Sequence, residues 1–449
     1  MANLVVTAKE MAQKLPYPIA KFVKYVPFNL RMGSAYTQSR DLIAEFRYKT
    51  IVERKAWLLT QMRRVLADAY RDIPFYKSFY NQQGFDPDSV CTWDDLQRIP
   101  ILTKEILRSV APELKARPGG GRMLLNTGGT SGQPFEFFVD GNAFAREWAH
   151  MHAIWERLGY KRTDLKLTLR GKNHGKQAIR YNPVHNELSV NAYGDRAQLA
   201  LELNDWISRQ PILYVHGYPS AIYEAMVYLR DHAPAVLEKL KTNLQGVFYG
   251  SEYPAPQYRD TVRQCLGCAD ISWYGHSEMA VLAGENGEAH TYEPFHTYGY
   301  VEALVDSHGT ARLLGSSLMN SAAPLIRYDT GDIIKPTVDQ GLLTSFQVSE
   351  GRIGDFVTDK SGKRIPLTAL VFGRHHKLFS WASFVQVAQT EQGKVTVVIS
   401  ADPAQNKTPT NAAQDFDTSN VAIDFEFVMR DSPVKTPAGK TPLLIRLPD

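Results

Sequence analysis

The chain has 449 residues, of which 44% are hydrophobic and 22% charged, a composition typical of a globular protein with room for more than one domain. The formal net charge of +4 argues against a nucleic-acid surface, and no apolar run reaches the roughly 18 residues that span a bilayer. The three cysteines form no disulfide framework and the N-terminus lacks a signal peptide, so a cytoplasmic location is expected.

The first segment with a distinctive pattern is YPIAKFVKYVPFNLRMG, residues 17–33. It mixes aromatic and aliphatic residues with Lys21, Lys24 and Arg31, as segments on membrane surfaces do. Prolines interrupt any long helix there, so packing on the protein's own surface is the alternative to weak membrane-surface contact. Charged helices are expected to follow over residues 40–118.

The segment LLNTGGTSGQPFEFF, residues 124–138, places glycines and hydroxyl side chains between two apolar runs that predict strands. A hairpin turn needs only one or two such residues, whereas backbone N–H groups beside hydroxyls also suit a phosphate. The spacing is not that of a Walker loop, and alone it leaves turn and phosphate loop equally open. The loop residues are Thr127, Gly128, Gly129, Thr130, Ser131 and Gly132.

Strand-like and helical segments then alternate as far as residue 275, which predicts an α/β domain with a largely parallel sheet. Ligands of such sheets bind beyond the carboxyl ends of the strands. The motifs GSE (250–252) and YGHSE (274–278) both fall at the ends of predicted strands. Helices are expected over 142–159, 220–232 and 258–267, and strands over 166–170, 212–218, 244–252 and 270–275.

The pattern becomes all-β from residue 298 to 348, and a small terminal unit with a helix and strands begins near residue 353. Residues 402–420 are rich in Asp, Asn, Gln, Thr and Pro, which predicts a mobile loop. We therefore expect a large N-terminal domain over residues 1–352 and a small C-terminal domain over residues 353–449. The terminal helix is expected over 367–377 and the terminal strands over 384–390 and 394–401.

Four further stretches carry chemically useful side chains near tight turns. Each alone has an ordinary explanation as a turn or a solvated side chain. The stretches are YGHSEMA (274–280), RYDTGD (327–332), GRIGD (351–355) and KTPAGK (435–440).

Together with the glycine loop, in this order and spacing, these stretches resemble the adenylate-forming (ANL) superfamily of acyl-CoA synthetases, peptide-synthetase adenylation domains and luciferases. The match is closest to the phenylacetate–coenzyme A ligase branch and its CapK-like capsule-biosynthesis relatives, whose N-terminal region looks like residues 72–108. Residues 213–224 and 249–252 match that branch too, and the resemblance covers about residues 60–449. It implies an AMP-forming carboxylate ligase with a large mixed α/β adenylation domain and a small mobile α+β lid.

The resemblance also implies a role for each matching residue. Glu278 would bind Mg²⁺, Ser277 would touch the α-phosphate of ATP, and Lys440 would reach that phosphate during catalysis. Asp332 would bind the ribose, and Asp355 would lie near the hinge of the lid. The rest of the ATP site would comprise the six glycine-loop residues, Gly250, Ser251, Glu252, Tyr274, Gly275 and Arg352, and the substrate pocket would comprise His216, Tyr218, Pro219, Trp273 and His276.

The chemistry implied is attack of a carboxylate oxygen on the α-phosphorus of ATP, with release of pyrophosphate, followed by acyl transfer. Charge neutralisation by Mg²⁺ and a lysine suits such phosphoryl chemistry. Coenzyme A is the first acceptor expected, and amide or ester formation on an amine or sugar, in polysaccharide or natural-product biosynthesis, is the alternative. A catalytically inactive nucleotide-binding scaffold is a third hypothesis. The acid, and the choice between monomer and homodimer, stay open.

Overall fold

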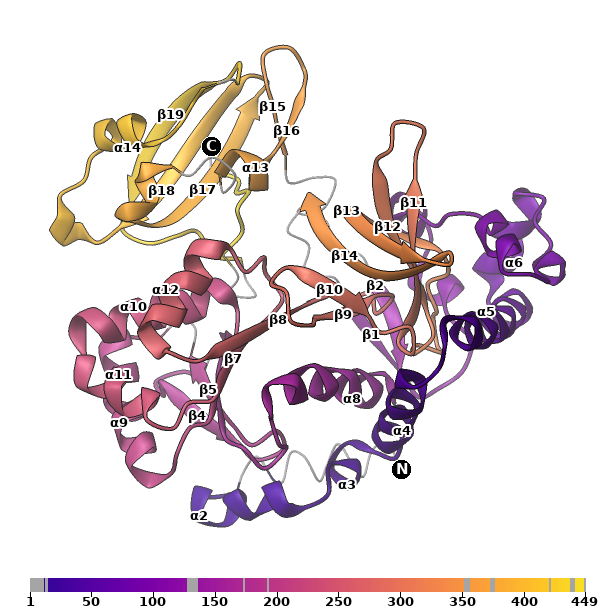
Figure 1. Cartoon of the computed structure of the whole chain (residues 1–449), viewed down its shortest axis with the longest axis horizontal. Coiled ribbons are helices and arrows are strands. Elements are labelled where there is room, and N and C mark those ends of the chain that lie inside the picture. Colours follow the sequence, from indigo (N-terminus) through magenta and orange to yellow (C-terminus); the bar gives the residue numbers. More distant parts are fainter. Residues whose placement is uncertain are drawn as a thin grey trace.

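The computed structural model describes residues 12, 15–126, 136–172, 174–191, 194–350, 356–371, 376–419, 421–436 and 441–447. Its centre is a twelve-stranded sheet that joins a parallel half to an antiparallel half, and a small domain with its own sheet lies above it (Figure 1). Among the described residues, no helix combines the length and the apolar character needed to cross a bilayer. The strand order is β11-β12-β13-β14-β10-β9-β8-β7-β6-β3-β5-β4.

The parallel half contains five strands that run in the same direction, as the strand–helix alternation predicted. The antiparallel pair β4 and β5 between residues 179 and 191 was not expected from the sequence. The five parallel strands and the antiparallel edge strand β4 together make up this half of the sheet. They are β3 (Lys166–Lys172), β4 (Ile179–Asn182), β5 (Glu187–Asn191), β6 (Tyr214–Gly217), β7 (Gly246–Tyr249) and β8 (Ala269–Gly275). The helices α9 (Arg196–Arg209), α10 (Pro219–His232), α11 (Pro234–Lys241) and α12 (Pro256–Leu266) cover one face of this half (Figure 1).

The antiparallel half confirms the all-β expectation for residues 298–348. One detail differs, because the TGD of RYDTGD is not a separate turn between strands. It lies inside β13, where Gly331 takes a left-handed φ of 80° and the pairing with β12 shifts register. The strands are β9 (Leu282–Glu285), β10 (Thr291–Pro294), β11 (Gly299–Val305), β12 (Ala311–Ser317), β13 (Tyr328–Asp339) and β14 (Leu342–Glu350).

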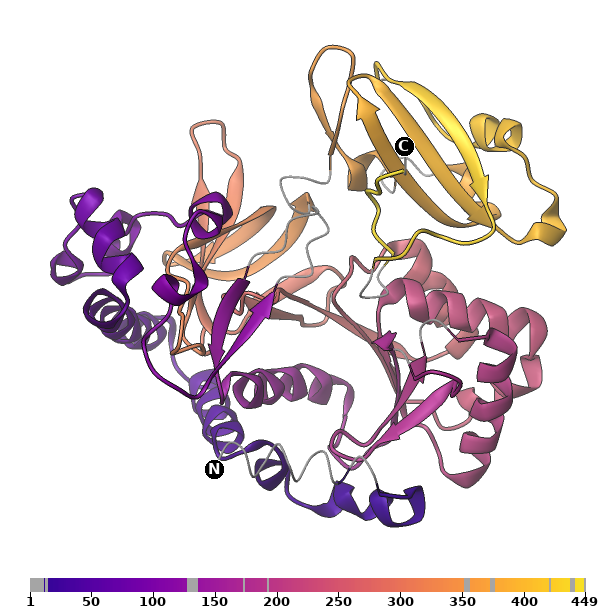
Figure 2. The same ribbon diagram turned by 180° about the vertical axis from the view of Figure 1, so that it is seen from behind.

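The glycine-rich segment is flanked by the two strands that the sequence predicted. These are β1 (Arg122–Asn126) and β2 (Glu136–Asp140), which pair antiparallel with Asn126 opposite Glu136. The loop residues 127–135 lie outside the described residues. The next helix, α8 (Ala143–Trp155), continues into the 3₁₀ turn η5 (Glu156–Leu158) and lies beside the central sheet, on the face opposite α10 and α12 (Figures 1 and 2).

The region before β1 is helical, as expected for residues 40–118. Its longest helix begins with a capping box, in which Thr50 and Glu53 satisfy each other's backbone N–H groups. The helices are α2 (Tyr17–Ala20), α3 (Phe28–Met32), α4 (Ala35–Arg47), α5 (Ile51–Asp72), α6 (Pro74–Gln82) and α7 (Lys104–Arg108), with 3₁₀ turns η1 (Lys21–Tyr25), η2 (Pro87–Ser89), η3 (Asp94–Arg98) and η4 (Pro112–Lys115).

The small C-terminal domain has its own three-stranded sheet and a core in which Val387, Val397 and Ile399 are fully buried. The expected mobile loop over 402–420 contains a helix instead, because Thr408 and Asn411 form a capping box that fixes its first turn. Strand β19 was not predicted either. The elements are β15 (Phe356–Thr358), β16 (Arg364–Pro366), α13 (Leu367–Val371), η6 (Lys377–Ser380), β17 (Ala382–Glu391), β18 (Lys394–Ala401), η7 (Pro403–Gln405), α14 (Pro409–Asp415) and β19 (Asp424–Arg430).

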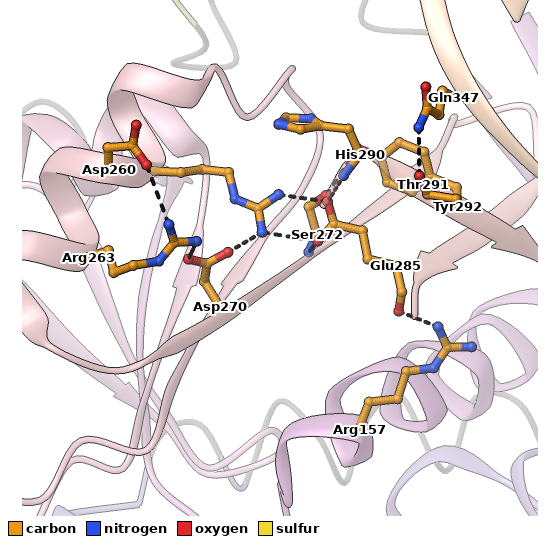
Figure 3. Close-up of polar contacts among 11 residues, drawn as sticks. Arg157, Asp260, Arg263, Asp270, Ser272, Glu285, His290, Thr291, Tyr292 and Gln347 are labelled. Atoms are coloured by element: carbon orange, nitrogen blue, oxygen red, sulfur yellow. Dashed lines mark hydrogen bonds and ion pairs between the residues drawn. The ribbon is translucent and has the colours of Figure 1, made fainter. Parts of the chain in front are cut away.

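A buried ion network fixes α12 against the middle of the central sheet. Arg259 on α12 contacts the carboxylates of Asp270 on β8 and Glu285 on β9. Glu285 also accepts hydrogen bonds from the backbone N–H groups of Ser272 and His290, at 2.7 and 2.6 Å (Figure 3). The network holds β8, the strand at the junction of the two sheet halves, in a fixed position relative to α12.

Candidate functional site

A cavity of about 590 Å³ lies beyond the carboxyl ends of β6, β7 and β8. Helix α8 and strands β13 and β14 form further walls, and the small domain contributes Val385, Thr441, Pro442 and Leu443. This is the sheet edge at which the sequence placed the GSE and YGHSE motifs. Parallel strands bring their loops together at one edge, so residues distant in sequence meet there.

Two predicted nucleotide-binding residues meet on one wall of this cavity. The hydroxyl of Tyr274, near the end of β8, donates a hydrogen bond to the Asp332 carboxylate on β13. The irregular pairing of β13 around Gly331 is where Asp332 leaves the regular ladder. The Tyr274 ring meets Phe346 edge to face, with ring centroids 5.3 Å apart. Asp332 is 6% exposed, so its carboxylate is accessible mainly from the cavity.

Glu278 lies on the same wall and is 3% exposed. Its Oε1 lies 3.8 Å from Lys104 Nζ and accepts a 3.4 Å hydrogen bond from the Tyr328 hydroxyl. Its Oε2 lies 3.3 Å from His276 Nδ1. Lys104 was not predicted, because only the pairing of Leu102 beside β13 brings residue 104 close to residue 278.

The GSE segment has three different environments. An added Cβ on Gly250 would lie 1.9 Å from the Trp273 ring, so glycine is needed there for packing. Ser251 takes a left-handed φ of 69° and accepts a hydrogen bond from Arg170 at 3.1 Å. The Glu252 carboxylate accepts hydrogen bonds from Ser220 Oγ at 2.7 Å and from the backbone N–H of Thr441 at 3.0 Å. Ser251 and Glu252 line the cavity with Gly275 and Ser277.

Only some of the residues predicted for the substrate pocket line the cavity. His216, Trp273 and His276 line the cavity, whereas Tyr218 and Pro219 are buried residues outside its lining. The His216 ring lies 4.9 Å from Trp155 and 5.5 Å from Trp273, between centroids. Burial holds the pKa of His216 well below its ordinary value, so this imidazole is neutral near pH 7.

Helix α8 supplies a wall that the sequence analysis did not assign to the site. Five residues on one face of the helix line the cavity, at the helical spacings i, i+3, i+4, i+7 and i+11. The same periodicity predicted the helix, but an apolar face is equally compatible with ordinary core packing. The carboxylate of Glu147 on this otherwise apolar face was the sequence signal that could have assigned the helix to the site. The residues are Phe144, Glu147, Trp148, Met151 and Trp155.

Several predicted site residues lie outside the described residues, namely the glycine loop, Arg352, the hinge residue Asp355 and Lys440. The boundary at residue 352 falls in the same undescribed stretch and stays a prediction. Thr441, which follows Lys440 in the sequence, lines the cavity and bonds to Glu252. A second contact between the domains joins Lys435 Nζ to Glu224 on α10 at 2.9 Å.

The carboxylates of the cavity wall can be compared with the ligands that a metal ion requires. Across the residues that the structure describes, no group of three or more His, Cys, Asp or Glu side chains could enclose an ion. Mg²⁺ does not require such a group, since it is commonly held by one or two carboxylates, waters and the phosphates of its substrate. Glu278 on the cavity wall fits that arrangement, with the bound nucleotide supplying further oxygen ligands.

No family model matches the chain. No curated protein matches it either. Solved structures with the same fold include 2-hydroxyisobutyryl-CoA ligase in the postadenylation state, in complex with 2-HIB-AMP or R3-HIB-AMP. Both superpose with a TM-score of 0.64 at 18% and 17% identity, and cover 88% of this chain and 90% of that enzyme.

Two other states of that enzyme match less well. Its thioesterification state gives a TM-score of 0.54 at 17% identity, and its open conformation gives 0.53 at 18%; each again covers 88% of this chain, and 90% and 92% of that enzyme. The fold of this chain, a large sheet-rich domain with a small C-terminal sheet domain, is therefore that of an adenylate-forming ligase.

Proposed function

We propose that this protein is an enzyme that uses ATP to activate a carboxylic acid as an acyl-adenylate and then transfers the acyl group to an acceptor. The observation that carries the proposal is the meeting of Tyr274, Asp332 and Glu278 on the wall of one cavity. The resemblance of the sequence motifs implies nucleotide and metal binding for these residues, independently of the fold. The fold adds a second line of support.

The described side chains account for much of what the first half-reaction requires. Asp332 can accept hydrogen bonds from ribose hydroxyls, and the Tyr274 ring gives a flat surface for the base. The small domain lines the cavity with Thr441, Pro442 and Leu443, which would limit the access of water to a bound nucleotide. Mg²⁺ at Glu278 would supply positive charge beside the phosphates, and Lys440 is proposed to supply more.

Coenzyme A is the acceptor that we propose first, in keeping with the phenylacetate–coenzyme A ligase resemblance. The alternative acceptor is an amine or a sugar, in keeping with the CapK-like resemblance. Both hypotheses share the adenylation step and the same cavity, and differ only in the nucleophile that attacks the acyl-adenylate. The inactive-scaffold hypothesis differs in predicting nucleotide binding without turnover.

The test is acid-dependent exchange of radiolabelled pyrophosphate into ATP over a panel of aryl, alkyl, amino and hydroxy acids. Exchange with at least one acid that requires Mg²⁺ supports adenylation. ATP binding without exchange for any acid supports the scaffold instead. Product analysis with coenzyme A, amines and sugars, added one at a time to an active acid, then identifies the acceptor.

A further inference from the structure

Glu147 is the charged residue on the face of α8 that lines the cavity, and its four neighbours on that face are apolar or aromatic. Trp155 stacks on Phe248 with ring centroids 4.9 Å apart and planes 4° apart, so this wall is packed against the sheet. Glu147 also lines a second, smaller cavity of about 370 Å³, beside β1 and Ser277. Glu147 therefore lines both cavities.

The carboxylate of Glu147 has charged neighbours but no direct partner. Within the part of the chain that the structure describes, no hydrogen bond or ion pair reaches it. Burial raises the pKa of Glu147 to about 7, while the charges of Arg170 and His276 lower it. Arg170 itself donates to Ser251 and lies over the Tyr218 ring, 5.6 Å from its centroid.

A carboxylate in an aromatic cavity without a partner is unfavourable unless a ligand supplies a hydrogen-bond donor. We propose that Glu147 selects carboxylic acids that carry such a donor, an ammonium or a hydroxyl group, on an apolar body. The rings of Trp148 and Trp155 would contact the apolar body, and Glu147 would accept the donor. The inference rests on the proposed function in one respect, because it takes the ligand to be the acyl substrate.

Ligands without a carboxylate separate this inference from adenylation. Binding of 2-phenylethylamine, 2-phenylethanol and ethylbenzene can be followed by tryptophan fluorescence, since Trp148, Trp155 and Trp273 line the cavity. We expect the wild type to bind the amine or the alcohol roughly 10- to 100-fold more tightly than ethylbenzene, as hydrogen bonds to charged groups allow. If the amine binds more tightly, the preferred donor is an ammonium group, and if the alcohol binds more tightly, it is a hydroxyl group.

The Glu147→Gln variant keeps the shape of the side chain and should bind the three ligands within about threefold of one another. Glu136→Gln is the matched control, because Glu136 is an exposed carboxylate at the smaller cavity. Equal preference in the wild type and the Glu147→Gln variant, or no binding of either donor ligand at millimolar concentration, would overturn the inference.

Pyrophosphate exchange by the same variants distinguishes a failure of the Glu147 inference from a failure of the proposed adenylation. Exchange with 3-phenylpropionate and with its 3-amino and 3-hydroxy forms should favour a donor-bearing acid in the wild type only. Unchanged acid preference in an active Glu147→Gln variant rejects the inference and leaves adenylation standing. Loss of donor preference in binding, with no exchange for any acid, rejects adenylation and leaves the Glu147 site standing.

A second inference comes from residues 17–33, at the opposite end of the molecule from the small domain (Figures 1 and 2). The segment is anchored by Tyr17, which meets Trp206 edge to face at 4.7 Å, and by Phe28, which is 5% exposed. Arg31, expected on the membrane-facing side, is instead buried and donates to the Val184 carbonyl at 2.7 Å. Tertiary packing removes that charge from the surface.

Four large apolar side chains of the segment face solvent, whereas Ala20 is buried and Met32 packs against a buried cluster. Large apolar side chains remain 58–68% exposed, and Lys21 and Lys24 lie beside two of their rings, while residues 15–40 contain no Asp or Glu. Exposed apolar groups beside cations are complementary to an anionic lipid surface, and Asp164, which lies outside the segment, is an acidic neighbour of Lys24. We infer that this face docks on membranes rich in anionic lipid. The exposed apolar residues are Ile19, Phe22, Tyr25 and Leu30.

Co-sedimentation with vesicles tests this docking. We expect binding to phosphatidylcholine vesicles that contain 30 mol% phosphatidylserine, weakened at least about fivefold by salt or by Phe22→Ser with Tyr25→Ser. Tyr48→Ser is the matched control, because Tyr48 is 86% exposed outside this face. Equal sedimentation with and without vesicles contradicts docking, and so does a stable dimer that the Phe22→Ser, Tyr25→Ser variant dissociates.

Discussion

The Tyr274 hydroxyl donates a hydrogen bond to the Asp332 carboxylate across the space between β8 and β13, at the wall of the large cavity. The two residues are 58 positions apart in the sequence. The contact orients the carboxylate, because one oxygen is held by the phenol.

Removal of the Asp332 carboxylate should weaken ATP binding. A carboxylate that accepts ribose hydroxyls contributes about 1.5–3 kcal/mol for each charge-assisted bond, so Asp332→Ala should lower the affinity at least about tenfold by calorimetry. Tyr274→Phe should have a smaller effect, since it removes orientation alone. Asp339→Ala, an exposed aspartate on the same strand, is the control, and unchanged affinity in Asp332→Ala would refute the ribose assignment.

Glu278→Gln should abolish Mg²⁺-dependent pyrophosphate exchange while the fold survives. The amide keeps the volume of the side chain but lacks the negative charge that attracts a divalent cation. We expect a loss of roughly 10²-fold or more at saturating ATP, as for one preorganised electrostatic group. Glu288→Gln, at an exposed turn, should leave exchange unchanged. Full activity of Glu278→Gln at saturating Mg²⁺ would exclude the metal role.

Lys440→Ala should separate the two half-reactions. A charge needed only as the pentavalent phosphorus forms lowers kcat with little effect on ground-state binding, by about 10²–10³-fold. Transfer from a supplied synthetic acyl-adenylate should stay near the wild-type rate. Lys363→Ala, an exposed lysine of the small domain, is the control. An equal loss of rate in both half-reactions would mean that Lys440 supports domain docking. Unchanged rates in both half-reactions would mean that Lys440 is a solvated lysine.

Arg259→Met should destabilise the large domain strongly. The variant leaves two buried carboxylates, Asp270 and Glu285, without the cation that faces them, and such losses cost about 3–5 kcal/mol. Arg263→Met is a matched control, because Arg263 is 51% exposed although it also contacts Asp270 (Figure 3). Chemical unfolding followed by tryptophan fluorescence measures both. Similar stability of the two variants would contradict the importance of the buried network.

Glu147 should make the stability of the protein depend on pH. Its folded pKa of about 7 exceeds the roughly 4.3 of an unfolded glutamate, so the folded state binds the proton more tightly. The resulting stabilisation, about 1–3 kcal/mol, is complete below pH 4 and is lost as the pH rises through 7. Glu147→Gln should therefore reduce the fall in Tm between pH 5.5 and 8. An identical fall in both proteins would contradict the raised pKa.

The sequence alone predicted the parts of the fold that depend on local periodicity. The strand–helix alternation of residues 142–275 determined the parallel half, because each strand and helix carries its own apolar pattern. The all-β pattern of residues 298–348 determined the antiparallel half in the same way. The helix α14 was missed, since its stability depends on the Thr408 capping box more than on hydrophobic spacing.

For the site, the sequence predicted, through the resemblance of its motifs, that Tyr274, Glu278 and Asp332 lie near a ligand, and this stays a prediction. Only the tertiary structure decided that Lys104 faces Glu278, that Gly250 gives room for Trp273, and that Arg31 is buried. It also turned one face of α8 into a cavity wall, with Glu147 on it. These contacts join segments that are far apart in the chain, and local periodicity carries no information about which distant segment will cover a given face.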